Sequence, residues 1–89
     1  MTRVSWTVSA LVDLQEIRRY IAEFNPAAAQ TLAEQVIEAS NSLVIFPRRG
    51  RLVGDNLREI MPVFPYLLRY EIVGDAVNIL RVRHGMRVQ

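Results

Sequence analysis

The residues best suited to chemistry lie at the end of the chain, in the sequence ILRVRHGMRVQ (79–89). Arg81, Arg83 and Arg87 surround His84, which is the only histidine of the protein. An imidazole is a common general base, and arginines bind phosphate and stabilise the negative charge that develops on it. The cluster is typical of a metal-free ribonuclease site or of a surface that docks an anionic partner. The simpler alternative is a histidine that bonds only to backbone at the end of a strand.

A second group of cations lies in the segment PRRGR (47–51). In a ribonuclease, Arg49 and Arg51 would act together with Arg81 and His84 on the RNA phosphate. Two other interpretations remain open for this segment. It is a solvated loop, or it contacts a nucleic acid or an acidic protein.

Several classes of site are excluded by what the sequence lacks. The chain has no cysteine, so it has no disulfide, no thiolate metal site and no cysteine nucleophile. It also has no glycine-rich phosphate loop. Asp13, Glu16 and Glu23 are spaced like the solvated side of a helix, and a single histidine adds little to a ligand set. We therefore expect no metal and no cofactor.

The composition is that of one globular domain covering residues 1–89. Of the 89 residues, 51% are hydrophobic and 22% are charged, which argues against extensive disorder. All eleven basic residues are arginine, and the formal net charge is +2. The chain contains neither an apolar run of membrane-spanning length nor the apolar region of a signal peptide, which predicts a cytoplasmic location.

Two helices are predicted after a short β-prone start at residues 3–6. Between residues 8 and 24, apolar side chains recur every three or four positions, which is typical of an amphipathic helix. Thr7 or Ser9 is a suitable N-cap for it. Asn25 and Pro26 have the residue types of a second helix start, and that helix should end before Pro47. The short link between the two predicts an antiparallel helical hairpin.

Three strands are predicted after the loop at residues 47–56, at residues 57–61, 66–72 and 76–82. Gly74 and Asp75 are suited to a two-residue hairpin turn between the last two strands. The order is thus β-α-α-β-β-β. We expect a two-layer α+β domain in which the helical hairpin packs on a small antiparallel sheet.

The turn at Gly74 and Asp75 also predicts how the last two strands face each other. It places Tyr70 opposite Ile79 and Tyr66 opposite Arg83, so that Arg81 and Arg83 lie at the end of the face that the helices cover. The opposite face should then carry Leu67, Arg69, Leu80, Val82 and His84. That face is partly apolar, which indicates that a partner chain covers it.

Five segments together resemble the ParE toxins of bacterial toxin–antitoxin modules, of the plasmid stabilisation type. They are WTVSALVDLQEIRRYIAEFNPAAAQ (6–30), FPRRGR (46–51), LRE (57–59), PYLLRYEI (65–72) and VNILRVRHGMR (77–87). The resemblance covers nearly the whole chain, in order. It implies the fold of the RelE/ParE superfamily, whose element order agrees with the one derived above.

The resemblance implies one of two toxic activities. RelE-like members cut messenger RNA on the ribosome, whereas ParE-like members inhibit DNA gyrase and so block replication. RelE-like enzymes carry a catalytic arginine where this chain has Leu67, and they use lysines and a late aromatic residue that it lacks. The differences favour a gyrase-binding toxin without catalysis of its own. A ribonuclease, and an inactive relative that only binds its antitoxin, remain as alternatives.

The resemblance also implies a ParD-like antitoxin whose C-terminal segment folds onto the toxin in a hetero-oligomer. Such coupled folding requires an exposed apolar groove. Candidate positions are the outer side of the helical hairpin and the set Leu67, Arg69, Leu80 and Val82. For gyrase, we expect a basic surface with a flexible end after Gly85. Its residues are Arg81, Arg83, His84 and Arg87, joined by Arg49 and Arg51.

Overall fold

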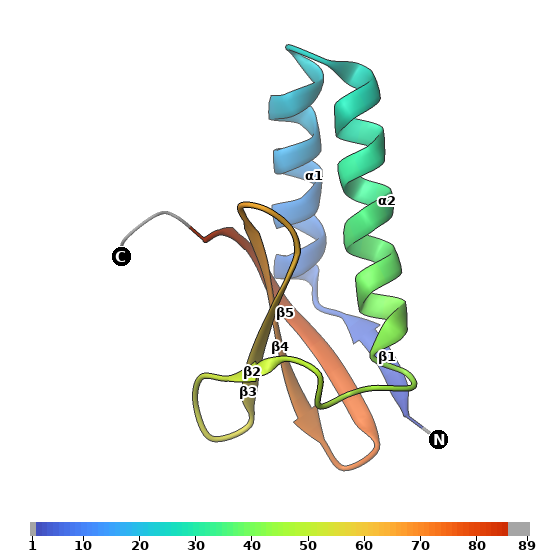
Figure 1. Ribbon diagram of the computed structural model, residues 1–89, viewed down its shortest axis with the longest axis vertical. Helices are drawn as coiled ribbons and strands as arrows, with labels where there is room; N and C mark the ends of the chain where they lie inside the picture. Colours follow the sequence, from blue (N-terminus) through green and yellow to red (C-terminus); the bar gives the residue numbers. More distant parts are fainter. Residues whose placement is uncertain (1, 86–89) are drawn as a thin grey trace.

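The computed structural model of the protein describes residues 2–85 and contains two helices and five strands (Figure 1). The predicted two-layer α+β fold is confirmed, with one short strand added in the loop after the second helix. The elements are β1 (Arg3–Trp6), α1 (Val8–Ala22), α2 (Pro26–Ser42), β2 (Arg51–Leu52), β3 (Leu57–Val63), β4 (Tyr66–Val73) and β5 (Ala76–His84).

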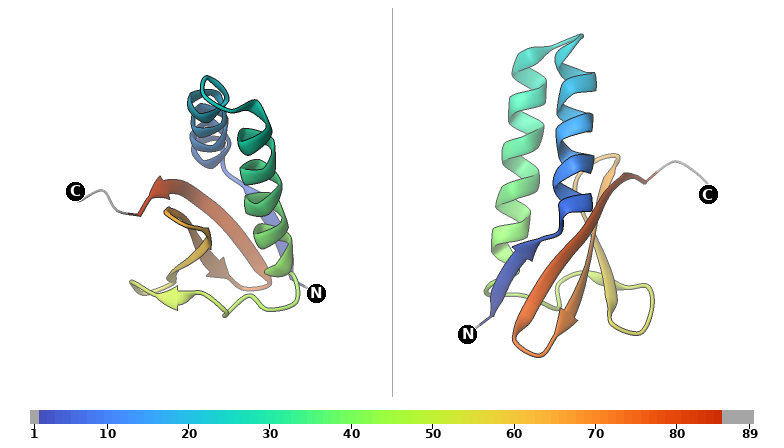
Figure 2. Two further views of the ribbon diagram at one scale, coloured as in Figure 1. Left: turned by 45° about the horizontal axis from the view of Figure 1, so that its top comes forward. Right: turned by 180° about the vertical axis from the view of Figure 1, so that it is seen from behind.

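Both helices begin at side-chain caps that the sequence predicts. The hydroxyl of Thr7 accepts a hydrogen bond from the amide of Ala10 (3.1 Å), and the side chain of Asn25 accepts one from the amide of Ala28 (3.1 Å). Each cap satisfies an amide that has no partner within its own helix. The two helices lie side by side, run in opposite directions and cover one face of the sheet (Figure 2).

The sheet has the strand order β1-β5-β4-β3-β2 and is mixed rather than antiparallel. β1 runs parallel to β5, with Val4 opposite Val77 and Trp6 opposite Ile79. The expectation of a purely antiparallel sheet is therefore wrong for this pair. The pairing makes β5 an interior strand along residues 76–79, whereas the rest of β5 has, among residues 2–85, β4 as its only neighbouring strand.

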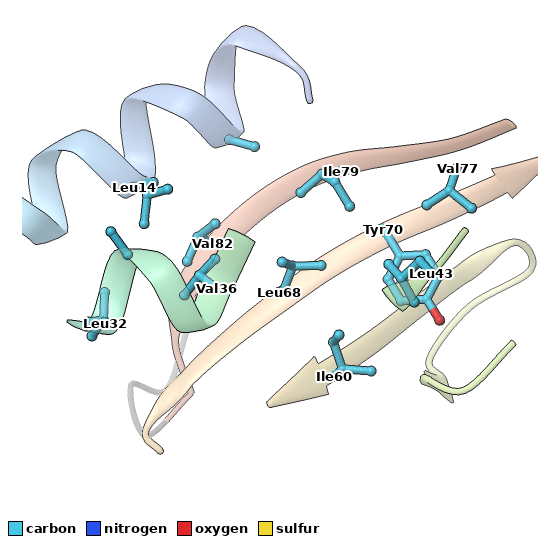
Figure 3. Packing of buried hydrophobic residues seen from close by; sticks show 12 residues of the cluster. Leu14, Leu32, Val36, Leu43, Ile60, Leu68, Tyr70, Val77, Ile79 and Val82 are labelled. Atoms are coloured by element: carbon cyan, nitrogen blue, oxygen red, sulfur yellow. The ribbon is translucent and has the colours of Figure 1, made fainter. Parts of the chain in front are cut away.

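The core lies between the helices and the sheet. Tyr70, Leu68, Val77 and Ile79 of the two long strands are fully buried, and Val36 and Leu43 lie against them from the helix side (Figure 3). Ala10 and Ala33 are also buried, and their small side chains permit close packing of the helices. The core therefore fixes how the two helices sit on the last two strands.

A β-bulge corrects the predicted register of β4 and β5. The pairs agree with prediction from Val73 opposite Ala76 to Tyr70 opposite Ile79, but Arg69 is opposite Arg81. Leu80 is thus an extra residue on β5, and such an insertion shifts every later pair by one. Because a shift of one residue exchanges the two faces of a strand, Val82 lies in the core instead of outside it.

The strand β3 also extends further than predicted. It continues through Pro62 to Val63, whereas the sequence suggested an end at the proline. The pairing with β4 is irregular between Ile60 and Val63. An irregular pairing accommodates a residue that has no amide hydrogen to donate.

Candidate functional site

The end of β5 is flanked by helix α1, because β1 stops at Trp6 and covers only the first part of β5. Thr7 forms the transition from β1 to α1. Its amide donates to the carbonyl oxygen of Ile79 (3.0 Å), and its hydroxyl lies 2.9 Å from the same oxygen and 3.2 Å from that of Leu80. The first turn of α1 is therefore anchored on the strand edge that β1 leaves open.

Asp13 continues this attachment one turn further along α1. Its Oδ2 accepts hydrogen bonds from the amide of Val82 (2.9 Å) and from Nε of Arg81 (2.7 Å), and its Oδ1 accepts one from Nη2 of Arg81 (3.0 Å). The Asp13 side chain is 13% exposed and that of Arg81 is 43% exposed. The expectation that Asp13 belongs to a solvated helix face is thus wrong, since the bulge brings Arg81 and Val82 to it.

The pKa of Asp13 reflects these contacts. Burial on its own raises the pKa of this carboxyl, but the hydrogen bonds from Arg81 and Val82 and the charges of Arg81 and Arg83 outweigh burial. The pKa of Asp13 therefore lies below its ordinary value of 3.8. Asp13 in turn raises the pKa of Arg81, through the hydrogen bond and through its charge. At neutral pH the pair is a fully ionised, bidentate salt bridge.

An open groove of about 550 Å³ lies between α1 and the end of β5. Aromatic rings are part of its lining, and the ring of Tyr66 meets that of His84 edge to face with centroids 5.4 Å apart. Its charged residues are two carboxylates of α1 and two arginines of β5. The lining residues are Asp13, Glu16, Ile17, Tyr20, Tyr66, Arg81, Val82, Arg83 and His84.

Two further arginines of the sheet share one carboxylate. Glu59 on β3 is 8% exposed and lies opposite Arg69 on β4 and Arg51 on β2. Its Oε2 accepts hydrogen bonds from Nη2 (2.6 Å) and Nε (2.8 Å) of Arg69, and its Oε1 lies 3.5 Å from Nη2 of Arg51. Arg69 lies opposite Arg81 on the neighbouring strand β5, and Arg81 is bound to Asp13. The side chains of Arg51, Glu59, Arg69 and Arg81 therefore form a row of charges across the sheet that ends at Asp13.

The residues predicted for a ribonuclease do not come together. Arg81 and His84 both line the groove, whereas Arg51 lies three strands away from Arg81, about 14 Å at the usual strand spacing. Arg49 donates a hydrogen bond to the hydroxyl of Ser42 at the end of α2 (2.6 Å). Of the predicted gyrase-binding residues, Arg83 also lines the groove, and Arg87 lies outside the described residues.

The predicted antitoxin-binding set is only partly accessible. Leu67 and Arg69 are half-buried on the face of the sheet away from the helices, and Leu80 is half-buried at the bulge. Val82 is 3% exposed and lies in the core. Its side chain is therefore almost fully buried in the isolated chain, contrary to the prediction.

The described part of the chain gives no sign of a metal centre or a membrane span. Within residues 2–85, no three histidine or acidic side chains are placed so that they would hold a metal ion. Neither α1 nor α2 is long and apolar enough to cross a membrane.

Comparison with known proteins gives consistent results. Residues 4–89 match the family described as ParE toxin of type II toxin–antitoxin system, parDE. Toxin RelE2 of Caulobacter vibrioides is 46% identical over 88 residues, which cover 99% of this chain and 100% of the relative. Putative toxin Y4kP of Sinorhizobium fredii is 33% identical over 93% of this chain and 88% of its own length.

A solved structure confirms the fold. A chain of the chromosomal ParDE TA system from P. aeruginosa superimposes with a TM-score of 0.79, over 94% of this chain and 96% of that chain, at 24% sequence identity. The match over almost the whole sequence, together with the shared fold, leads to one conclusion. The chain belongs to the ParE toxin family of type II toxin–antitoxin systems.

Proposed function

We propose that the protein inhibits DNA gyrase, and thereby DNA replication, by binding to it and without catalysing a reaction. Family membership makes the chain a toxin of a toxin–antitoxin system. The observation that supports gyrase inhibition without catalysis is that the residues predicted for RNA cleavage are dispersed. Arg49 and Arg51 lie outside the groove that holds Arg81 and His84.

The hydrogen bonds of Arg81 favour a role in binding over a role in catalysis. Two of its three guanidinium nitrogens already donate to Asp13. An RNA phosphate at this position would compete with a carboxylate that forms two charge-assisted hydrogen bonds. In a ribonuclease the arginine that stabilises the transition state must be available to the phosphate. The pairing with Asp13 therefore makes Arg81 a poor catalytic residue.

The end of β5 is the surface we assign to the target. Arg81, Arg83 and His84 line the groove there, and Arg87 follows in the sequence. A groove with aromatic walls and a cationic strand suits a protein partner that presents acidic side chains. Arg51 lies on β2, the edge strand furthest from β1, and Arg49 lies in the loop just before it. Both would belong to an extension of this contact. Because gyrase acts on chromosomal DNA in bacteria, the proposal implies action in the cytoplasm.

The same family membership implies an antitoxin, for which we propose a ParD-like protein that forms a hetero-oligomer with this chain. Val8, Leu11 and Val12 are 77%, 51% and 43% exposed. They lie on one face of α1, because positions three and four apart are neighbours on a helix. This stripe on the outer side of the hairpin is the larger apolar surface. Leu67, Arg69 and Leu80 offer a smaller one on the sheet.

A second candidate function is ribosome-dependent cleavage of messenger RNA. The names of two relatives favour it, Toxin RelE2 and Toxin RelE1 of Caulobacter vibrioides, the second at 35% identity over 90% of this chain. Arg49, Arg51, Arg81 and His84 would then carry catalysis. It would require these residues to move together on the ribosome. A third possibility is a relative that binds its antitoxin and is not toxic.

Two assays in parallel distinguish these functions. Purified protein, free of antitoxin, is mixed with gyrase, ATP and plasmid, and separately with ribosomes programmed with messenger RNA. We expect loss of supercoiling and accumulation of cleaved plasmid in the first assay, and intact messenger RNA in the second. The reverse pattern would replace gyrase inhibition with ribonuclease activity. A folded protein that is inactive in both assays and harmless on expression would indicate the third possibility.

A further inference from the structure

The arginines near the sheet differ in whether a carboxylate already neutralises them. Arg51 and Arg69 share Glu59, and Arg81 is held by Asp13. Arg83 lines the groove but forms no ion pair with any residue among 2–85. The two arginines of β5 that border the groove are therefore not equivalent. One is used inside the molecule, and the other retains its hydrogen-bond donors for a partner.

Asp13 holds more than the side chain of Arg81. It also accepts the hydrogen bond of the Val82 amide, on the edge of β5 that β1 no longer covers. An amide at an open edge would otherwise bond to water, and the strand end would be held from one side only. The carboxylate thus ties the end of β5, including Arg83 and His84, to helix α1.

We infer that Asp13 is a positioning residue for target binding, that Arg83 contacts the target, and that Arg81 acts through Asp13 rather than on the target itself. This inference rests on the proposed function, in which the end of β5 is the target-binding surface. It assigns different roles to two arginines that the sequence presents as equal members of one cluster. It also gives a role to a carboxylate that lies 68 positions away in the sequence.

Removal of the Asp13 carboxylate changes the affinity for the target in opposite directions under this inference and under simple charge attraction. If the groove only attracts an acidic partner by its charge, removal of a nearby carboxylate should strengthen binding. If Asp13 positions the strand, the variant Asp13→Ala should bind more weakly although every arginine is still present. Glu16→Ala is the matched control, because Glu16 lines the same groove on the same helix and forms no ion pair among the described residues.

Arg81→Gln and Arg83→Gln form a second matched pair, since each removes one charge from the same strand. Affinity for gyrase is measured by titration at a temperature where circular dichroism shows each variant folded. We expect Arg83→Gln to weaken binding about 10-fold to 100-fold, the usual contribution of a hydrogen bond to a charged group. We expect Arg81→Gln to weaken it less than about threefold, because glutamine can still donate to Asp13. Equal losses for the two variants would overturn the assignment of roles.

Amide hydrogen exchange tests the positioning of the strand without any target. In Asp13→Ala we expect the Val82 amide to exchange at least about tenfold faster than in the parent protein, with a much smaller change at Val77 in the β1-paired part of β5. Unchanged exchange at Val82, or equal acceleration at Val77, would refute the positioning role. If the parent protein does not bind gyrase, the proposed function fails. In that case this inference is still decided by the hydrogen exchange experiment and by growth arrest in cells, in which the variants Asp13→Ala, Glu16→Ala, Arg81→Gln and Arg83→Gln are ranked.

Discussion

The hydroxyl of Tyr70 accepts a hydrogen bond from the backbone amide of Gly50 over 2.9 Å. The same hydroxyl donates to the carbonyl oxygen of Pro47 over 2.7 Å. Arg58 adds hydrogen bonds from Nη1 to the carbonyl oxygens of Gly50 (2.8 Å) and Arg48 (3.2 Å). A buried phenol and a guanidinium thus hold the backbone of residues 47–51, so the arginines of this loop project from a fixed support.

The first prediction is that Gly50→Ala destabilises the protein. A Cβ at this position would lie 2.5 Å from the hydroxyl oxygen of Tyr70, a fully buried residue whose hydroxyl is held by hydrogen bonds to the loop. We expect a loss of about 1–3 kcal/mol in the free energy of unfolding, as for other overpacked sites. Urea denaturation measures it.

Gly54→Ala is the control for that substitution. There the nearest atom to a new Cβ is Cδ1 of Leu57 at 3.3 Å, the end of a side chain that can shift. We expect a change below about 0.5 kcal/mol, the usual effect of a surface substitution. Equal destabilisation by the two alanines would show that Tyr70 does not confine the loop at Gly50.

Replacement of Thr7 tests the junction between β1 and α1. Thr7→Val keeps the shape of the side chain but removes the cap of Ala10 and the hydroxyl contacts to Ile79 and Leu80. We expect a loss of about 1–2 kcal/mol in the free energy of unfolding, as for other helix N-caps. Thr7→Ser retains the hydroxyl and should lose clearly less. If thermal unfolding places the valine and serine variants together, the hydroxyl is not what joins the helix to the strand.

The β-bulge can be tested with two alanine substitutions. The corrected register buries Val82 in the core and leaves Leu80 half-buried as the extra residue. Val82→Ala should therefore cost about 1–3 kcal/mol, the contribution of a buried valine side chain with its cavity. Leu80→Ala should cost less, although it removes more carbon atoms. The opposite order in chemical denaturation would support the register without a bulge.

The ionisation of Asp13 predicts a pH dependence of stability. Because the pKa of Asp13 in the folded protein lies below its ordinary value of 3.8, the unfolded chain takes up a proton first as the pH falls. The stabilisation by Asp13 is therefore complete above about pH 4, near the ordinary carboxyl pKa. It is lost as the pH falls further, through the lower pKa of the folded state.

Comparison with Asp13→Asn isolates this contribution. The difference in unfolding free energy between the parent protein and the variant should be constant between pH 5 and 7 and should shrink below about pH 4. Asparagine does not titrate, so the remaining carboxylates cancel in the difference. A difference that stays constant down to pH 2.5 would contradict the lowered pKa.

The helices could be predicted from sequence because their signals are local. Thr7, Asn25 and Pro26 are caps or first residues whose effect depends only on the next few amides, and the apolar spacing of α1 identifies its buried side. The hairpin turn at Gly74 is equally local, and this glycine adopts a positive φ of 60°. These elements were sufficient to derive the fold class.

The pairing of β1 and the bulge could not be predicted, because they depend on contacts between distant segments. Ile79, Leu80 and Val82 are all apolar, so the pattern does not show that Leu80 interrupts the alternation, and a regular strand would place Leu80 and Val82 on the same face. The observed register is the one in which the Asp13 carboxylate accepts hydrogen bonds from the Val82 amide and the Arg81 side chain at the edge of the sheet. The cluster at residues 81–84 can be located from the sequence, but the contact of Asp13 with it cannot. The only available signal was its position beside the buried Ala10 and Leu14 on the helix.

The central claim is that this toxin acts by binding gyrase through the end of β5. The most direct measurement is the amount of cleaved plasmid that gyrase accumulates as the concentration of the protein rises, for the parent chain, Arg83→Gln and Arg18→Gln. Arg18 is an exposed arginine of α1 outside the groove and serves as the control for loss of charge. We predict cleavage with the parent and with Arg18→Gln, and strongly reduced cleavage with Arg83→Gln. Absence of cleaved plasmid with the folded, antitoxin-free parent chain would contradict the claim.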